Sequence, residues 1–109
     1  MTEAEFQSQI IDYAHLRGWL VAHFRGVRVQ RGNGTVHYQT PVAADGKGFV
    51  DLVLVRERVV FAEIKVGKNK MTNEQNMWAD ALWKAGRQEF YLWYPKDFDD
   101  IVKVLGPQE

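Results

Sequence analysis

The sequence predicts one α/β domain over residues 1–109, a mixed sheet flanked by helices in the order α-β-β-β-α-β-α. Three observations lead to this fold class. The chain has 109 residues, the size of one domain with a single core, and hydrophobic residues make up 46% of it. Segments with helical and strand periods alternate along the chain. A helix separates the last two strands, and this kind of crossover favours parallel pairing between them.

The amino-terminal half is expected to hold a helix, a strand and a long loop. The segment EAEFQSQIIDYAHLRG places Phe6 and Ile10 on one apolar stripe, and Thr2 precedes it as an N-cap. Residues 19–24, WLVAHF, form a short strand. Residues 25–48 are rich in Gly and Arg and predict a long loop, with a possible hairpin at its Gly-Asn-Gly sequence.

The carboxy-terminal half is expected to hold three strands and two helices. The runs FVDLVLV and VVFAEIKV are joined by the charged turn RER. A helix follows in TNEQNMWADALWKAG, where Thr72 and Gln75 form a capping box and Gly86 ends the helix. EFYLWY is a strand that Pro95 stops, and KDFDDIVKVL is a final helix. Four aromatic side chains recur with the periods of these elements and are expected in the core: Trp78, Trp83, Tyr91 and Trp93.

Composition excludes several kinds of site. The chain has no cysteine, so it has no disulfide, no thiolate zinc site and no cysteine nucleophile. A metal would be held by oxygen or imidazole ligands, which favours hard ions such as Mg²⁺ or Mn²⁺. No apolar run approaches the ~18 residues of a membrane span, and the polar start MTEAEFQSQ is unlike a secretory signal. We therefore expect a cytoplasmic protein without membrane contact.

The formal net charge is zero, but the charge is unevenly distributed. No Asp or Glu occurs from residue 13 to 44, and six Lys or Arg face three acids from residue 46 to 72. A basic middle segment of this kind suits a polyanionic partner, although a solvated surface with no partner explains it equally well.

The two middle strands carry a candidate reaction site. Strand alternation puts Glu63 and Lys65 on one face, and a short turn puts Asp51 of the preceding strand within reach of Glu63. Two carboxylates and the carbonyl oxygen of Ile64 offer the oxygen ligands that Mg²⁺ prefers, and an adjacent ammonium stabilises growing negative charge. A structural ion pair between Lys65 and Asp51 at a sheet edge is the alternative. The histidines lie on three different elements and are not expected to act as ligands or general bases: His15, His23 and His37.

The segment GKGFVDLVLV…VVFAEIKVGKNKMTNEQNMWADALWKAG resembles the VRR-NUC domain, a branch of the PD-(D/E)XK nuclease superfamily. The resemblance covers nearly the whole chain and implies a restriction-endonuclease-like fold. Its most specific part is EIK, followed ten residues after the lysine by a helix glutamine and then by the ending LWKAG. The catalytic residues of the family fall on four positions of this chain: Asp51, Glu63, Lys65 and Gln75.

Two positions in this comparison need comment. Val50 stands where the family usually has proline before the aspartate, a position that shapes the strand and is not a ligand. The family's first helix contributes an acid, which falls on Glu5 or Glu3; the sequence EFQ favours Glu5. A favourable charge in the first helical turn is the alternative role for Glu5, and the capping box is the alternative for Gln75.

The resemblance implies a Mg²⁺- or Mn²⁺-dependent endonuclease acting on branched or Holliday-junction DNA; many stand-alone members are phage-encoded and work in the host cytoplasm. Phosphate contacts are expected from basic residues near the site: Arg25, Arg28, Arg31, Lys47, Lys68 and Lys70. Cutting a four-way junction symmetrically favours a homodimer paired through TVHYQTPV, against a monomer that nicks flaps or single strands. A catalytically silent DNA-binding module and a small restriction-type enzyme are the alternative functions.

Overall fold

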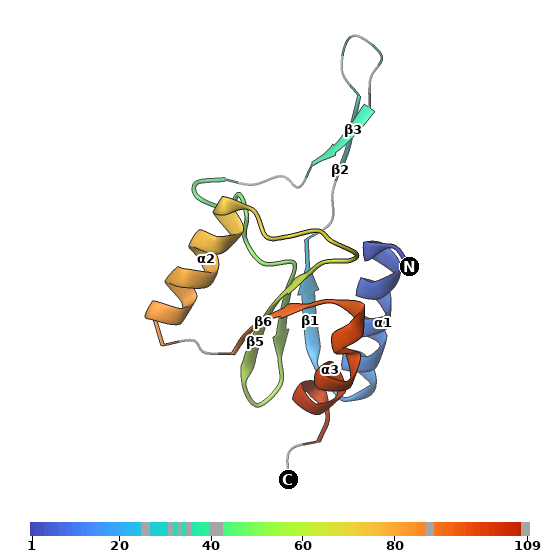
Figure 1. Ribbon diagram of the computed structural model, residues 1–109, viewed down its shortest axis with the longest axis vertical. Coiled ribbons are helices and arrows are strands. Elements are labelled where there is room, and N and C mark those ends of the chain that lie inside the picture. Colours follow the sequence, from blue (N-terminus) through green and yellow to red (C-terminus); the bar gives the residue numbers. More distant parts are fainter. Residues whose placement is uncertain are drawn as a thin grey trace.

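The chain folds around a four-stranded mixed sheet with helices on both of its sides, as the computed structural model shows (Figure 1). The structure describes residues 1–24, 27–30, 32, 34, 36–39, 43–86 and 89–107, and in 27–30 and 36–39 it describes the backbone only. Within these residues the elements follow the chain in this order: α1 (Glu3–Leu16), β1 (Leu20–His23), β2 (Val27–Gln30), β3 (Val36–Gln39), β4 (Leu52–Val55), β5 (Val59–Ile64), α2 (Asn73–Lys84), β6 (Phe90–Trp93), a 3-10 turn η1 (Pro95–Asp97) and α3 (Phe98–Leu105).

The four-stranded sheet has the order β1-β4-β5-β6. β4 pairs antiparallel with β1 and with β5, and β5 pairs parallel with β6 across the α2 crossover. The predicted α/β class, its element order and the parallel crossover are confirmed. The β4–β5 turn comprises residues 56–58, as the RER sequence predicts.

Both long helices begin with the capping boxes expected from their sequences. Thr2 Oγ1 accepts the Glu5 N–H at 3.1 Å and Glu5 Oε1 accepts the Thr2 N–H at 2.9 Å. In α2, Thr72 Oγ1 accepts the Gln75 N–H at 3.2 Å and Gln75 Oε1 accepts the Thr72 N–H at 2.8 Å. Each pair satisfies amide groups that have no partner inside the helix, and so sets where the helix begins.

One face of the sheet carries the core. Alternate residues of β4 and β5 point to this face, where α1 and α3 cover them. The fully buried apolar side chains of the cluster come from all of these elements: Phe6, Ile10, Ala14, Leu52, Leu54, Val60, Ala62, Ile64, Ile101 and Leu105. Trp19 and Trp93 close its ends, each 2% exposed.

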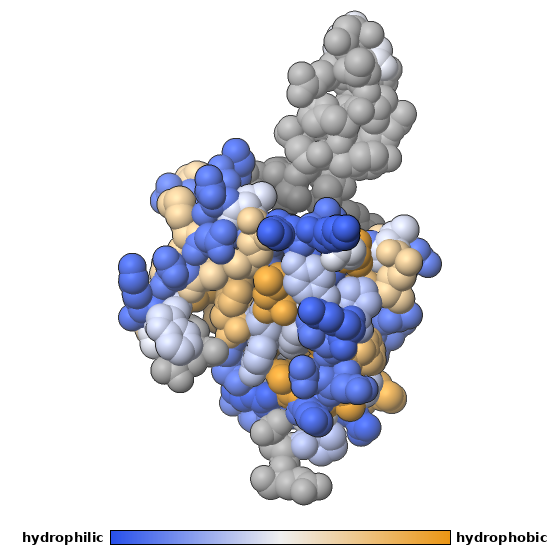
Figure 2. All heavy atoms as spheres, in the orientation of Figure 1, coloured by the Kyte–Doolittle hydropathy of each residue, from blue (hydrophilic) through white to orange (hydrophobic). Residues whose placement is uncertain are grey.

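The other face of the sheet is covered less completely. α2 lies beside this face and contacts β6, and Figure 2 shows hydrophobic side chains along its sheet-facing side, but none of its residues is fully buried. Trp93 lies in the core as predicted, whereas Tyr91 and Trp78 are half-buried. The prediction is wrong for Trp83, whose side chain is 62% exposed because the end of α2 extends past the sheet.

The strands β2 and β3 form a separate antiparallel ribbon, which stands away from the main sheet in Figure 1. The hairpin expected in the long loop is thus present, and β3 comprises four residues of the segment TVHYQTPV. No helix among the described residues is long and apolar enough to cross a membrane.

Candidate active site

Asp51 and Glu63 meet at the end of the β4–β5 hairpin that lies away from the turn. The register pairs Leu52 with Ala62, so Asp51 lies opposite Glu63, as strand alternation and the short turn predict. The Asp51 N–H donates to Glu63 Oε1 at 2.9 Å, and the Ile64 N–H donates to Asp51 Oδ2, also at 2.9 Å. Each carboxylate is therefore fixed by a backbone amide of the other strand.

The second oxygen of each carboxylate remains for a ligand. Glu63 is 1% exposed, and its Oε2 is buried without a hydrogen-bond partner in the part of the chain that the structure describes. Asp51 is half-buried, and its Oδ1 has no hydrogen-bond partner among the described residues. An unpartnered buried carboxylate oxygen is costly, and such an atom is a signal of a function outside the folding of the chain.

The electrostatic environment is unfavourable to the charged acids. Burial, and after it the Asp51 carboxylate, raises the pKa of Glu63 to about 8. Burial also raises the pKa of Asp51, against the lowering effects of the Ile64 N–H and of Lys65. Lys65 follows β5, where its own N–H donates to the Trp93 carbonyl oxygen at 3.0 Å. Its ammonium is the cation that offsets this acid pair.

The first-helix acid at this site is Glu3 rather than Glu5. Burial, and after it the Asp51 carboxylate, raises the pKa of Glu3, and Lys65 lowers it, so Glu3 belongs to the same cluster. Glu3 and Asp51 also line one cleft. Glu5 is exposed, its carboxylate holds the Thr2 N–H, and this hydrogen bond lowers the pKa of Glu5. The preference for Glu5 is corrected, because the capping box turns its side chain toward the start of the helix.

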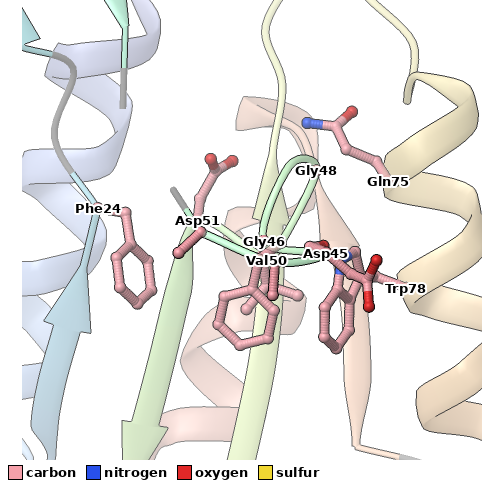
Figure 3. Close-up of a pocket in the computed structure, with 11 residues that line it drawn as sticks. Phe24, Asp45, Gly46, Gly48, Val50, Asp51, Gln75 and Trp78 are labelled. Atoms are coloured by element: carbon pink, nitrogen blue, oxygen red, sulfur yellow. Dashed lines mark hydrogen bonds between the residues drawn. The ribbon is translucent and has the colours of Figure 1, made fainter. Parts of the chain in front are cut away.

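Gln75 combines a structural role with a place at the site. Its Oε1 is occupied by the Thr72 N–H, as the capping box requires, which leaves the two N–H groups of the amide. Gln75 and Asp51 line the same pocket, and Figure 3 shows the two polar groups on the same side of it. The structure thus brings Gln75 close to the carboxylate pair, and the capping box does not prevent this.

The expected phosphate contacts fall into three groups. Lys68 and Lys70 are exposed on the segment between β5 and α2, over which Figure 2 shows strongly hydrophilic side chains. Lys47 is also exposed, and its ammonium lies 3.2 Å from a Glu74 carboxylate oxygen, which compensates part of its charge. The remaining three lie outside the described side chains: Arg28, in β2, and Arg25 and Arg31, outside the described residues altogether.

Two features of the site were not predicted from the sequence. His23 lines the same cleft as Glu3 and Asp51, and its Nδ1 is buried with no hydrogen-bond partner among the residues that the structure describes. Phe24 follows it, and the Phe24 N–H donates to the Asp51 carbonyl oxygen at 3.4 Å. The sequence gives little indication of either feature. Phe24 is the last residue of the predicted first strand, and no local pattern shows that this strand lies beside Asp51.

The donor set fits a hard divalent cation. Among the described residues, no group of three or more His, Asp or Glu side chains is arranged as a complete cation-binding cluster. Mg²⁺ does not need one, because it usually binds through one or two carboxylates and keeps several waters. The second oxygens of Asp51 and Glu63, together with the carbonyl oxygen of Ile64, which follows Glu63 in the chain, meet this requirement.

Comparison with protein-family models, with curated proteins and with solved structures finds no match to this chain.

Proposed function

We propose that this protein is a Mg²⁺- or Mn²⁺-dependent endonuclease that hydrolyses DNA phosphodiester bonds, in the manner of the VRR-NUC branch that its sequence resembles. The observation that carries the proposal is the interlocked pair of Asp51 and Glu63. Each carboxylate accepts a backbone amide of the opposite strand, yet Glu63 Oε2 is buried with no partner among the described residues, and the pKa of Glu63 is raised to about 8. A bound cation removes this electrostatic cost, whereas a purely structural role leaves it unexplained.

Four residues of the site have a role in this reaction. Asp51 and Glu63 hold the cation through their second oxygens, together with the Ile64 carbonyl oxygen. When bound, a divalent cation supplies positive charge at the phosphate and a water of lowered pKa. The Lys65 ammonium donates to the phosphate oxygens as water adds to phosphorus and one bridging P–O bond breaks. The products are one phosphate-bearing end and one hydroxyl end.

A cleavage assay tests the proposal. Labelled branched, duplex and single-stranded DNA are incubated with the protein in Mg²⁺, in Mn²⁺ and in EDTA. We expect cleavage with either metal and none in EDTA, and we expect Asp51→Ala and Lys65→Ala to abolish cleavage while DNA binding stays measurable. Full activity of Asp51→Ala refutes the proposed site. Binding without cleavage on every substrate favours the silent DNA-binding module instead.

We further propose that the substrate is branched DNA and that two chains act together on it. Symmetric cuts across a four-way junction need two sites, and a two-fold homodimer supplies them with the symmetry of the junction. β3 pairs with β2 of the same chain on one side. Among the described residues, no strand pairs with its other side, so this edge is available for pairing with a second copy. Light scattering with and without junction DNA tests this: a monomer in both conditions that nicks one strand refutes the dimer.

A further inference from the structure

A pocket of about 540 Å³ opens directly beside Asp51, between the end of β1 and the start of α2 (Figure 3). Its volume is in the range of ligand sites. Polar groups lie at one side of it and aromatic rings at another. The residues that line it include Phe24, Phe49, Val50, Asp51, Gln75 and Trp78.

Three aromatic rings form a row along this pocket. The Phe24 and Phe49 ring centroids lie 5.6 Å apart at an interplanar angle of 74°, and those of Phe49 and Trp78 lie 4.9 Å apart at 77°. Both contacts have the edge-to-face geometry that aromatic pairs prefer. Phe49 and Trp78 are half-buried, whereas Phe24 is 48% exposed, so its ring remains open to a ligand.

The row is held in a defined position. The Trp78 Nε1–H donates to the Asp45 carbonyl oxygen at 3.0 Å. Gly48 approaches the start of α2 so closely that a Cβ there would lie 2.5 Å from the Glu74 Cβ and 2.7 Å from its carbonyl carbon; with a φ of +83°, this position requires glycine. The pocket is therefore preformed and does not depend on ligand binding to order its rings.

The polar side of the pocket places hydrogen-bond donors next to the carboxylate pair. Gln75 Oε1 is occupied by the Thr72 N–H, so the amide nitrogen is the group that a ligand meets. In Figure 3 this nitrogen is turned toward the side where the Asp51 carboxylate lies. A flat ligand on the aromatic row can thus receive an amide N–H while a group attached to it reaches Asp51.

We propose that this pocket holds an unpaired nucleobase of the DNA strand whose phosphate lies at Asp51; the inference rests on the proposed nuclease function. A base is flat and aromatic, carries ring nitrogens or carbonyl oxygens that accept an amide N–H, and is linked through its sugar to a phosphate. Proteins bind single strands by stacking bases on such rings, with little sequence preference. The pocket selects substrates with an unpaired nucleotide beside the bond that is cut, which gives the preference for branched DNA a physical basis.

Binding in the absence of metal separates this pocket from catalysis. Fluorescence anisotropy at low salt in EDTA compares a single-stranded oligonucleotide with one of equal length and charge that is abasic at its central positions. We expect the wild type to bind the intact strand roughly tenfold more tightly, the effect of about one stacked base. Phe24→Ala should remove this difference, and its affinity for the abasic strand should equal that of the wild type.

Two further variants complete the test. Phe24→Leu keeps apolar bulk against Phe49 but has no aromatic face, so we expect it to lose most of the preference with its fold intact. Leu20→Ala removes a side chain that is 75% exposed on the same strand but outside the pocket, and it should bind as the wild type does. Equal affinities of Phe24→Leu and wild type on both strands overturn the base pocket. Failure of the wild type to cleave any DNA in Mg²⁺ overturns the nuclease proposal itself.

Discussion

The two ends of the β4–β5 hairpin carry similar numbers of charged side chains but treat them in opposite ways. At the turn, Arg56 and Arg58 both pair with Glu57, and Arg58 also pairs with Glu89. Hydrogen bonding to Arg56 lowers the pKa of Glu57 to about 2. At the open end, burial raises the pKa values of the acids, the Asp51 carboxylate raises those of Glu63 and Glu3 further, and the pKa of Glu63 reaches about 8.

The turn end also shows what a structural charge cluster looks like in this fold. The Arg56 guanidinium donates to the carbonyl oxygens of Leu105 and Gly106, at 3.3 and 3.1 Å, and lies 4.6 Å from the Trp19 ring centroid. Its positive charge faces the carboxy-terminal end of α3, where the helix dipole favours a cation. Each of the charged side chains at the turn has a partner of opposite charge, whereas the carboxylates at the open end have raised pKa values, a difference that supports the proposed cation site there.

Neutralising one acid at each end should give the largest difference. Asp51→Asn still accepts the Ile64 N–H but loses the charge that holds a cation, so we expect DNA cleavage in Mg²⁺ to fall by roughly a thousandfold or more. Its thermal midpoint should stay the same or rise, because the amide no longer repels Glu63. Glu57→Gln is the matched change at the turn and should leave cleavage per folded molecule unaltered. Equal losses of activity in both variants contradict the comparison.

The second largest effect is a pH dependence of stability between about pH 4.5 and 8, which comes from the open end, because the lowered pKa of Glu57 at the turn acts only at lower pH. Burial raises the pKa of Glu63 from 4.5 to about 8, so the folded chain binds an extra proton between these values. This proton stabilises the folded state. Without metal, the stabilisation is fully present below about pH 4.5 and is lost as the pH rises through about 8, and its loss lowers the free energy of unfolding by on the order of a few kcal/mol. Urea unfolding in EDTA across this range measures it.

Two controls sharpen this measurement. Glu63→Gln has no proton to release and should flatten the pH dependence. The proposed Mg²⁺ site requires the ionised acid pair, so the rise in thermal midpoint on adding Mg²⁺ should be larger at about pH 9 than at about pH 6. A wild-type stability that is independent of pH over this range would refute the raised pKa of Glu63.

At the turn end, removing a cation should cost stability without affecting the reaction. The Arg58 guanidinium is hydrogen-bonded to Glu57, Glu89 and the Val104 carbonyl oxygen. Arg58→Ala removes the donor to Glu89 and to the Val104 carbonyl oxygen, whereas Glu57 keeps its hydrogen bonds from Arg56. We expect the free energy of unfolding to fall by about 2–3 kcal/mol. Lys65→Ala is the counterpart at the open end and should lose activity with little change in unfolding. Chemical denaturation and a cleavage assay compare the two variants. A loss of cleavage in folded Arg58→Ala would contradict the assignment of a purely structural role to the turn end.

The smallest expected effect concerns the exposed lysines between β5 and α2. Among the described residues, Lys68 and Lys70 form no ion pair, unlike the arginines of the turn. As a phosphate contact, Lys70→Ala should lower the slope of log affinity against log salt by about 1 for any DNA sequence. Lys103→Ala removes an exposed lysine of α3 and should leave this slope unchanged. Identical slopes for both variants would exclude Lys70 from the DNA path.

The sequence by itself determined much of the sheet and the central pair of the site. Alternation along β5 and a three-residue turn are local properties, and together they force Asp51 opposite Glu63. The capping boxes at Thr2 and Thr72 are equally local, since they use residues three positions apart. In the hairpin, the two-residue period of the side chains and the length of the turn allow only one strand register that buries the apolar face.

The tertiary structure alone decided which residues surround that pair. The choice of Glu3 over Glu5 depends on how α1 docks on β1 and so brings Glu3 near Asp51. The meeting of Phe24, Phe49 and Trp78 requires β1, the segment before β4 and α2 to come together in space. Trp83 is exposed because α2 extends beyond the strand it contacts. Each of these outcomes depends on contacts between distant segments, and local periodicity carries no information about which faces will meet.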